Sequence, residues 1–362
     1  RQRDAHARLA RALTLEEDID LRALHLAYAS TDSDDAVVEL LVQSASRAAR
    51  RSGSPAAADM YEAAAQLVAH ASRRGKLLVL AAEAAWEGGA TARAGALLAR
   101  SAGSSLLPAD QGRAARVAGM MTLSRGHQGD AFRHYLDGAS SGGPDAADLV
   151  ARATGIAWWE GRYDWASRAA HAALESVSDD TALGRAVRRA APAGALLLAG
   201  RLEEAAPGIA AALELESEMD DLRGLLFLGE TAALIGDDET GMRVHQRACE
   251  VARQTGDLAE LPFALQVLGM LQAATGRLWE ARAMFDQGLR AAGAQDEERR
   301  GSFQLALLAQ LDALVGDEDA CRAHASRVIS SGGGGDIAVA NWALGRLELV
   351  RVSSDRLLMV LG

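Results

Sequence analysis

Glycines that follow helical patterns recur along most of this 362-residue chain at a nearly constant stride. They are Gly89, Gly126, Gly161, Gly200, Gly236, Gly276 and Gly316, with gaps of 37, 35, 39, 36, 40 and 40 residues. Each gap is long enough for two helices and two turns. Because self-similarity at a period of roughly 20 to 50 residues is the signature of stacked repeats, the spacing predicts an elongated array of helix pairs.

The residues at fixed offsets after each glycine support this repeat. Offsets of five, nine and twelve lie on one face of a helix. The residues five positions on are Ala94, Ala131, Ala166, Ala205, Gly241, Ala281 and Cys321, all of them small. Those twelve positions on are Ser101, Gly138, Ala173, Ala212, Ala248, Gly288 and Val328. Small side chains at these positions predict a second helix that nests closely on the first.

The segments Gly161-Arg-Tyr-Asp-Trp-Ala166 and Gly276-Arg-Leu-Trp-Glu-Ala281 resemble the tetratricopeptide pattern, in which a turn glycine precedes alternating aromatic and small residues. The resemblance covers residues 73 to about 350. It implies an all-α fold of tetratricopeptide-like helix-turn-helix repeats stacked into a right-handed superhelix. The stride exceeds the roughly 34 residues usual in that family, which implies extended helices or looser turns between repeats.

Prolines mark where helices begin, with one exception. Pro108, Pro144 and Pro262 lie 14 to 18 residues before their turn glycines, where each can open the first helix of a pair. Pro192 and Pro207 instead flank Gly200 inside expected helices. Two interpretations stay open: the array bends there because proline removes a helical hydrogen bond, or the two helices are shorter.

Residues 1–72 have helical patterns over 4–14, 20–29, 34–51 and 55–71 but no clear turn glycine. Asp34 precedes an apolar run and is expected to cap the third of these helices. This segment is therefore predicted to be a helical cap on the repeats.

Composition excludes several classes of protein. Hydrophobic residues make up 49% of the chain but aromatic residues only 4%, so Ala and Leu, which favour helices, supply most of the apolar mass. The net charge of -11 argues against direct contact with nucleic acid. No apolar run reaches the roughly 20 residues of a membrane span, and Cys249 and Cys321 have no metal-like spacing. These features predict a cytoplasmic protein without membrane contact.

The sequence carries no recognisable catalytic motif. It has no phosphate-binding loop, no HExxH and no Gly-x-Ser-x-Gly. The acidic pairs Asp34-Asp35, Asp179-Asp180, Asp220-Asp221 and Asp237-Asp238 lack the further carboxylate of a magnesium-binding DDxxD, and Asp237 follows a turn glycine, where acidic residues cap helices. We therefore expect no enzyme activity, metal site or cofactor in this segment.

In tetratricopeptide arrays the first helix of each pair lines the concave face. If the resemblance holds, the inward positions lie 13, 10, 6 and 3 residues before each turn glycine. They include Lys76, Glu83 and Asp148, and the candidate binding residues are Trp86, Arg113, Arg116, Met120, Trp158, Arg223, Glu230, Phe263, Gln266, Met270, Phe303, Trp342 and Arg346. A surface that mixes aromatic, Met, Arg and Glu side chains suits an amphipathic ligand or a peptide, although aromatics at helical spacing also serve as packing between repeats.

The N-terminal stretches 4–13, 20–29 and 34–39, followed by 56–64 and 88–98, resemble the junction after the ATPase in large ATP-binding LuxR-type regulators of actinobacteria, the family of the maltotriose-responsive activator. The resemblance implies a cap at 1–72 that joins an ATPase outside this chain, repeats at 73–352, and a tail at 353–362 that leads to a DNA-binding domain. It implies an effector-sensing segment, regulated by a small molecule or a protein and able to form homo-oligomers.

Three other classes remain open. A free-standing tetratricopeptide adaptor would grip a peptide carboxylate with Lys, Arg and Asn, an all-α enzyme would need clustered acids in a closed pocket, and a structural spacer would have an inner face without aromatic or charged clusters.

Overall fold

The structure is a computed structural model of the chain, and it describes residues 2–15, 18–30, 33–50, 54–256, 260–331 and 335–361. Within those ranges the regular elements are all helices, and no strand occurs. The predicted all-α class is therefore confirmed. None of the helices so described is long and apolar enough to cross a membrane.

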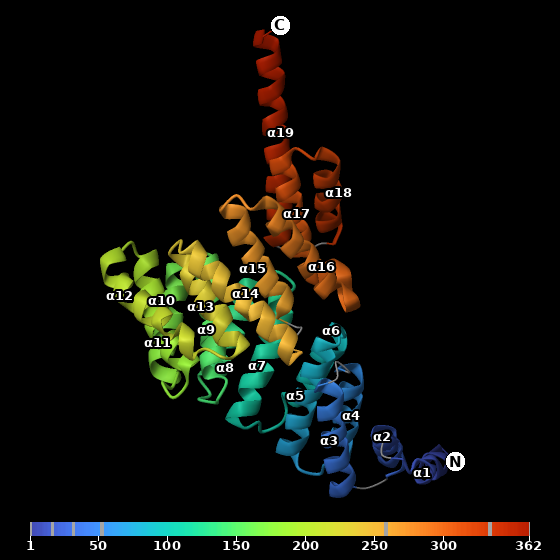
Figure 1. Cartoon of the computed structure of the whole chain (residues 1–362). Coiled ribbons are helices and arrows are strands. Elements are labelled where there is room, and N and C mark those ends of the chain that lie inside the picture. The colour runs from blue at the N-terminus through green and yellow to red at the C-terminus, as the bar shows by residue number, and fades with distance from the viewer. Residues whose placement is uncertain are drawn as a thin grey trace. The chain divides into compact units, whose positions relative to one another are not determined.

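The chain divides into two compact units, and Figure 1 labels the helices. Unit 1 consists of residues 1–121 and 133–149, and unit 2 of residues 122–132 and 150–362. The helices up to residue 149 are α1 Gln2–Ala12, α2 Ile19–Ala29, α3 Asp35–Arg50, α4 Ser54–Leu67, α5 Ala71–Glu87, α6 Thr91–Ser101, α7 Pro108–Leu123, α8 Gln128–Ala139 and the start of α9 Ala146–Trp159. The remaining helices are α10 Tyr163–Ser176, α11 Ala182–Leu198, α12 Leu202–Leu213, the short 3-10 helix η2 Glu214–Glu218, α13 Leu222–Leu234, α14 Asp238–Thr255, α15 Leu261–Ala274, α16 Leu278–Arg300, α17 Ser302–Val315, α18 Glu318–Ser331 and α19 Gly335–Leu361.

Each predicted turn glycine separates the two helices of a pair. All seven have a left-handed backbone, with φ between 62° and 81°. Only glycine adopts this conformation without a steric penalty on Cβ, which explains why glycine recurs at this point of every repeat. The turn glycines define seven helix pairs, which are α5–α6, α7–α8, α9–α10, α11–α12, α13–α14, α15–α16 and α17–α18. The predicted tetratricopeptide-like repeat of helix, turn and helix is confirmed.

The small residues predicted at the helix crossings are buried. Ala94, Ala131, Ala166, Ala281 and Cys321, five positions after their glycines, have no exposed surface. The residues twelve positions on are also buried throughout the seven repeats. These two positions are therefore the contact line along which the second helix lies on its partner.

Within three pairs, a glycine in the first helix makes room for a large ring in the second. A Cβ added to Gly119, Gly229 or Gly269 would lie 2.1, 2.2 or 2.5 Å from Tyr135, His245 or Phe285, respectively. In each pair the glycine stands seven residues before the turn glycine and the ring nine residues after it.

Other repeats divide the same space differently. The pair at these two positions is Ala193 with Ile209 in α11–α12, and Ala309 with Ala325 in α17–α18, and each pair lies within one buried cluster. Where the first-helix residue is alanine in place of glycine, the facing side chain is smaller than an aromatic ring, as close packing of a protein interior requires.

The predicted N-terminal cap consists of helices, as expected. Asp34 Oδ1 accepts hydrogen bonds from the backbone N–H groups of Ala36 (3.0 Å) and Val37 (3.2 Å), so its predicted capping role is confirmed. One hydrophobic cluster runs from Ala23 in α2 to Met121 in α7, so α2–α4 share a core with the first repeats. The predicted domain limits at 72/73 and 352/353 both lie inside helices, α5 and α19, and stay predictions.

Three of the four acidic pairs considered as fragments of a metal motif supply helix caps, through Asp34, Asp221 and Asp237. Asp237 accepts a hydrogen bond from the backbone N–H of Thr240 (3.1 Å), and Asp221 from that of Gly224 (2.9 Å). The prediction that Asp237 caps a helix is confirmed.

The prolines near Gly200 do not end their helices. α11 continues through Pro192 to Leu198, and α12 continues through Pro207 to Leu213. The interpretation that these helices are shortened at the prolines is therefore wrong, because the rest of each helix supplies its hydrogen bonds and its packing. The bend between residues 190 and 210 stays a prediction.

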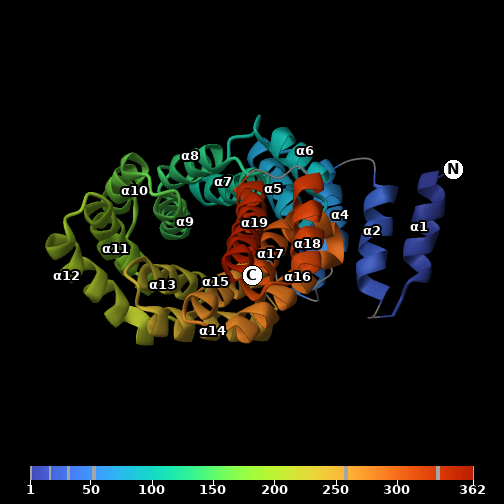
Figure 2. The same cartoon turned by 90° about the horizontal axis from the view of Figure 1, so that it is seen from above.

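In unit 2 the two helices of each pair occupy different sides. Figure 2 shows α11, α13 and α15 on the inner side of the array, together with α9, and α10, α12 and α14 on the outer side. The first helix of each pair is thus the one that can present residues to the inner face.

Candidate functional site

Three predicted inner residues of unit 1 come together as an ion-pair cluster. Arg113 Nη1 donates to Glu83 Oε2 at 2.9 Å, and Arg116 Nη2 donates to Glu83 Oε1. Burial lowers the pKa of Arg113, but the charge and hydrogen bond of Glu83 outweigh it and raise the pKa. Both arginines therefore share one carboxylate of the same chain as their ion-pair partner.

The other predicted residues of unit 1 pack in the core. Trp86 is 7% exposed and belongs to the hydrophobic cluster of unit 1, and Met120 packs against that cluster. These two side chains give stability and little accessible surface.

Trp158, the predicted inner residue of α9, packs between α11 and α13. Its ring stacks on Phe227 with centroids 5.6 Å apart, and a Cβ on Gly194 would lie 2.2 Å from its Nε1. The side chain is 7% exposed, and its Nε1 has no hydrogen-bond partner among the described residues. Trp158 therefore joins three successive first helices on the inner side of unit 2.

The neighbouring Trp159 contacts the predicted residue Glu230. Trp159 Nε1 donates a long hydrogen bond of 3.4 Å to Glu230 Oε1. Gly155, one turn earlier in α9, leaves room for the carboxylate, since a Cβ there would lie 2.8 Å from Glu230 Oε2. The contact joins residues 71 positions apart, so it spans from α9 to α13, past α11.

Burial controls the charge of Glu230. It raises the pKa of this carboxyl to about 7, against the opposing effects of the Trp159 hydrogen bond and the Arg152 charge, while Glu260 raises the pKa further. Desolvation disfavours the charged form of an acid. Glu230 therefore changes its charge near neutral pH.

An ion pair completes this region. Arg152 Nη2 in α9 contacts Glu260 Oε1, directly before α15, at 2.7 Å, and the two side chains are 17% and 15% exposed. In stacked repeats each repeat normally contacts only its neighbours. The pair instead joins residues 108 positions apart, across the two intervening helix pairs. We call Arg152, Trp159, Glu230 and Glu260 the inner site.

The remaining predicted residues of unit 2 lie on α13, α15, α17 and α19. Arg223, Phe263 and Gln266 are partly buried on α13 and α15, and Met270 and Phe303 pack against the cluster around Phe285. Trp342 on α19 is 58% exposed, and the Arg346 guanidinium lies 5.1 Å from its ring centroid.

Sequence reasoning missed three of the four inner-site residues. Trp159 lies one residue after the selected position 158 of α9, Arg152 lies one residue after the inward position 151, and Glu260 precedes α15 outside any repeat position. The double tryptophan Trp158-Trp159 is a signal in the sequence that could have identified Trp159. Glu260 gave none, because the contact depends on how several repeats stack.

A second polar cluster resembles a catalytic triad in composition only. Asp312 in α17 has no exposed surface, and it accepts hydrogen bonds from Arg282 in α16 and from His324 Nδ1 in α18, the latter at 2.7 Å. Cys321 lies three residues before His324 but is fully buried, and burial raises the pKa of its thiol. A nucleophilic cysteine needs a lowered pKa and access, so this cluster is structural.

The other described cysteine is no better suited to catalysis. Burial raises the pKa of the Cys249 thiol to about 11. In the parts of the chain that the structure describes, no three His, Cys, Asp or Glu side chains gather around a common point.

No family model matches the sequence, and no curated protein matches it. The chain is similar, at low sequence identity, to solved structures. A Rap protein complexed with Competence and Sporulation Factor is 12% identical, with 88% of this chain and 99% of that one aligned and a TM-score of 0.42.

Two further structures are described as tetratricopeptide proteins. The signal transduction ATPase with numerous domains and a tetratricopeptide repeat sensor, from Pyrococcus horikoshii, is 14% identical, with 91% of this chain and 56% of that one aligned and a TM-score of 0.41. The C-terminal part of a tetratricopeptide protein from Cytophaga hutchinsonii is 13% identical, with 72% of this chain and 98% of that one aligned and a TM-score of 0.36.

Proposed function

We propose that this chain is the non-catalytic, effector-sensing repeat region of a LuxR-type, ATP-dependent transcription regulator of the cytoplasm. A small-molecule or protein effector binds at the inner site of unit 2. The ATPase and the DNA-binding domain belong to the same regulator, outside this chain. The single observation that carries the proposal is Glu230, a partly buried carboxyl that has a pKa of about 7 and no ion pair with an arginine among the described residues.

A partly buried acid that forms no ion pair is costly for stability. Such groups are found at functional sites more often than elsewhere, because a binding site has to offer groups that a ligand can complete. Trp159 beside Glu230 adds an exposed aromatic surface. The inner site therefore combines a polar anchor with an apolar face.

The geometry also gives the effector a way to act. The Arg152–Glu260 and Trp159–Glu230 contacts hold α9 against α13 and the start of α15. A ligand that binds one spacing of these helices more tightly than another shifts the equilibrium toward that spacing. The attached ATPase then responds to the change, which couples effector binding to assembly on DNA.

The test perturbs the inner-site ion pair in the intact regulator. Arg152→Glu places two carboxylates together and should separate α9 from α15, changing basal nucleotide exchange and promoter binding. The double variant Arg152→Glu/Glu260→Arg restores opposite charges and should return both readouts toward their original values. Arg243→Glu is the control, since it removes an outer ion pair with Glu216 in unit 2.

The proposal fails if Arg152→Glu and the control Arg243→Glu both leave nucleotide exchange and promoter binding at the values of the unaltered regulator. The complete reading frame gives an independent check. A phosphate-binding loop before residue 1 and a helix-turn-helix after residue 362 would support the regulator, and the absence of both would refute it.

The alternative is a free-standing adaptor that binds peptide carboxylates. That function needs cationic side chains free to reach the ligand. Arg113, Arg116 and Arg152 instead form ion pairs with Glu83 and Glu260. A C-terminal peptide that binds the chain, and loses affinity when its carboxylate is amidated, would favour the adaptor.

A further inference from the structure

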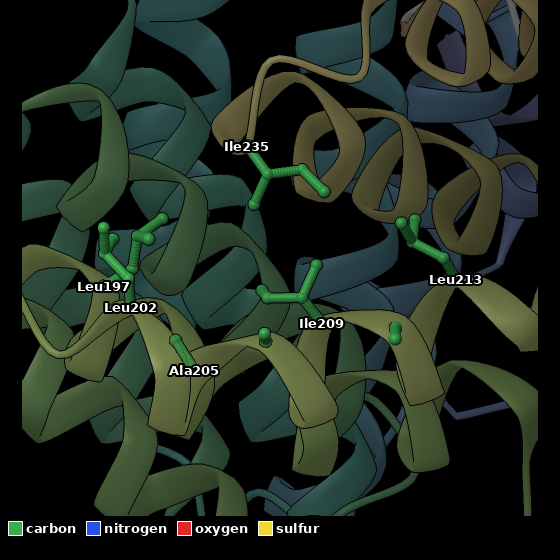
Figure 3. Close-up of a pocket in the computed structure, with 8 residues that line it drawn as sticks. Leu197, Leu202, Ala205, Ile209, Leu213 and Ile235 are labelled. Carbon is green, nitrogen blue, oxygen red and sulfur yellow. The ribbon is translucent and has the colours of Figure 1, made fainter.

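An apolar groove lies on the outer helix α12, away from the inner-site residues. Figure 3 shows Leu197, Leu202, Ala205, Ile209, Leu213 and Ile235 around it, and Ala206 and Ala210 complete the lining. The groove has a volume of about 290 Å³. Leu202 and Ile235 are 62% and 45% exposed, so large apolar side chains face solvent here.

Two features of the sequence hollow out this groove. Ala206 and Ala210 stand six and ten residues after Gly200, where the next repeat has the longer Met242 and Gln246. In addition, η2 follows α12 directly, and α12 packs on α11 far more than on α13. The apolar stripe of α12 is therefore left without a covering helix.

The lining favours protein side chains over a polar small molecule. All eight lining residues are apolar, whereas small-molecule sites include a few polar groups that fix the ligand's orientation. The volume is at the low end of the roughly 300 to 1,000 Å³ of ligand pockets. One or two apolar side chains of a partner helix fit such a groove, as in helix-in-groove recognition.

The edges of the groove carry surplus negative charge. Glu203 and Glu214 are next to the lining residues Leu202 and Leu213, and Asp238 follows Ile235 by three residues. In the described part of the chain these three carboxylates form no ion pair, whereas the nearby Arg201 and Arg243 are already paired with Glu204 and Glu216. Cationic groups on a partner would find complementary charge here.

We propose that the α12 groove docks an amphipathic helix of a partner protein, with apolar residues along one face and lysine or arginine beside them. The partner's apolar residues fill the space over Ala206 and Ala210. Its cations meet Glu203, Glu214 and Asp238. This interaction is separate from effector binding at the inner site.

The test uses two labelled peptides of about 14 residues, or four helical turns, with the full chain. Both have leucine at every third or fourth position, and the other positions are lysine in one and glutamate in the other. Fluorescence anisotropy measures binding. We expect the Leu/Lys peptide to bind at least tenfold more tightly than the Leu/Glu peptide, with an affinity that falls as salt is added.

Variants then locate the binding. Ala206→Met/Ala210→Gln fills the groove with the residues of the next repeat and should weaken Leu/Lys binding about tenfold. Ala99→Gln is the matched control, because Ala99 is exposed and stands ten residues after Gly89. Glu203→Gln/Asp238→Asn should weaken binding severalfold, and Glu250→Gln/Glu280→Gln, at exposed positions elsewhere in unit 2, should not.

Three results would overturn the proposal. The first is equal binding of the two peptides, the second is undiminished binding to the filled variant, and the third is equal weakening by the charge variant and its control. A fourth measurement addresses a different occupant: if the chain self-associates in sedimentation and Ala206→Met/Ala210→Gln abolishes it, the groove binds a second copy and the partner-helix proposal is wrong.

Discussion

Substitution of Gly269 tests the complementary packing of the helix pairs. In Gly269→Ala the new Cβ would lie 2.5 Å from Phe285, whose side chain is 1% exposed. Alanine in a helix interior gains about 0.5 to 1 kcal/mol over glycine. Overpacking a well-packed core costs about 1 to 3 kcal/mol. Because the ring has to move by about an ångström to reach an ordinary contact distance, we expect a net loss of about 1 to 2 kcal/mol.

The chain contains a matched control. Gly345 is also inside a helix, α19, but nothing lies within 4 Å of a Cβ built on it. Gly345→Ala therefore has the gain in helix propensity without the clash, and should raise the free energy of unfolding by about 0.5 to 1 kcal/mol.

A compensating change provides the second control. Gly269→Ala/Phe285→Ile recreates the pair found in α11–α12, Ala193 with Ile209. The double variant should be at least about 1 kcal/mol more stable than the sum of the two single changes predicts. Urea unfolding followed by far-ultraviolet circular dichroism measures all four variants. The reasoning is refuted if Gly269→Ala and Gly345→Ala shift stability in the same direction, or if the two changes at the pair simply add.

Two further predictions concern buried ionisable groups. Burial lowers the pKa of His245 from 6.5 to about 4. Between these pH values the imidazole is protonated in the unfolded chain but neutral in the folded chain. The free energy of unfolding therefore falls by up to about 3 kcal/mol as the pH drops from 6.5 to 4. His245→Phe, which copies the Gly269–Phe285 pair, should flatten the pH dependence of thermal unfolding, and an unchanged slope would contradict this. Burial raises the pKa of Asp312, but the hydrogen bonds of His324 and Arg282 outweigh it and lower the pKa, so this stability is present above the unfolded pKa and is lost as pH falls through the folded one. Asp312→Asn should cost about 2 to 4 kcal/mol at neutral pH by leaving the Arg282 guanidinium and the His324 ring without their carboxylate partner, and a thermal midpoint equal to that of the unaltered chain would disprove it.

The fold could be predicted because its determinants are local. The turn at Gly161 or Gly276 needs a left-handed backbone, and the helix after it needs a small residue five positions on. Each requirement acts within one repeat, so it appears in the sequence at a fixed offset. The interpretation that the helices near Gly200 are shorter was wrong, because α11 and α12 contain Pro192 and Pro207 within otherwise complete helices.

The inner site could be predicted only in part, because its contacts join distant repeats. The inward positions counted back from the turn glycines selected Glu230 and, on α9, Trp158. It could not find the Arg152–Glu260 ion pair, which depends on the accumulated rotation of several helix pairs. The same positions also selected Trp86, whose ring is buried in the core. The spacing along a helix is the same for a side chain that packs in the core and for one that faces the inner surface.

The ion pair between Arg152 and Glu260 has a consequence for how this molecule comes apart. In a purely nearest-neighbour array, thermal unfolding spreads inward from frayed ends, one repeat at a time. A link that spans from α9 to the start of α15 penalises every intermediate in which the helix pairs between them have melted. Helices α9 to α15 should therefore lose their amide protection against hydrogen exchange together, as a single cooperative block.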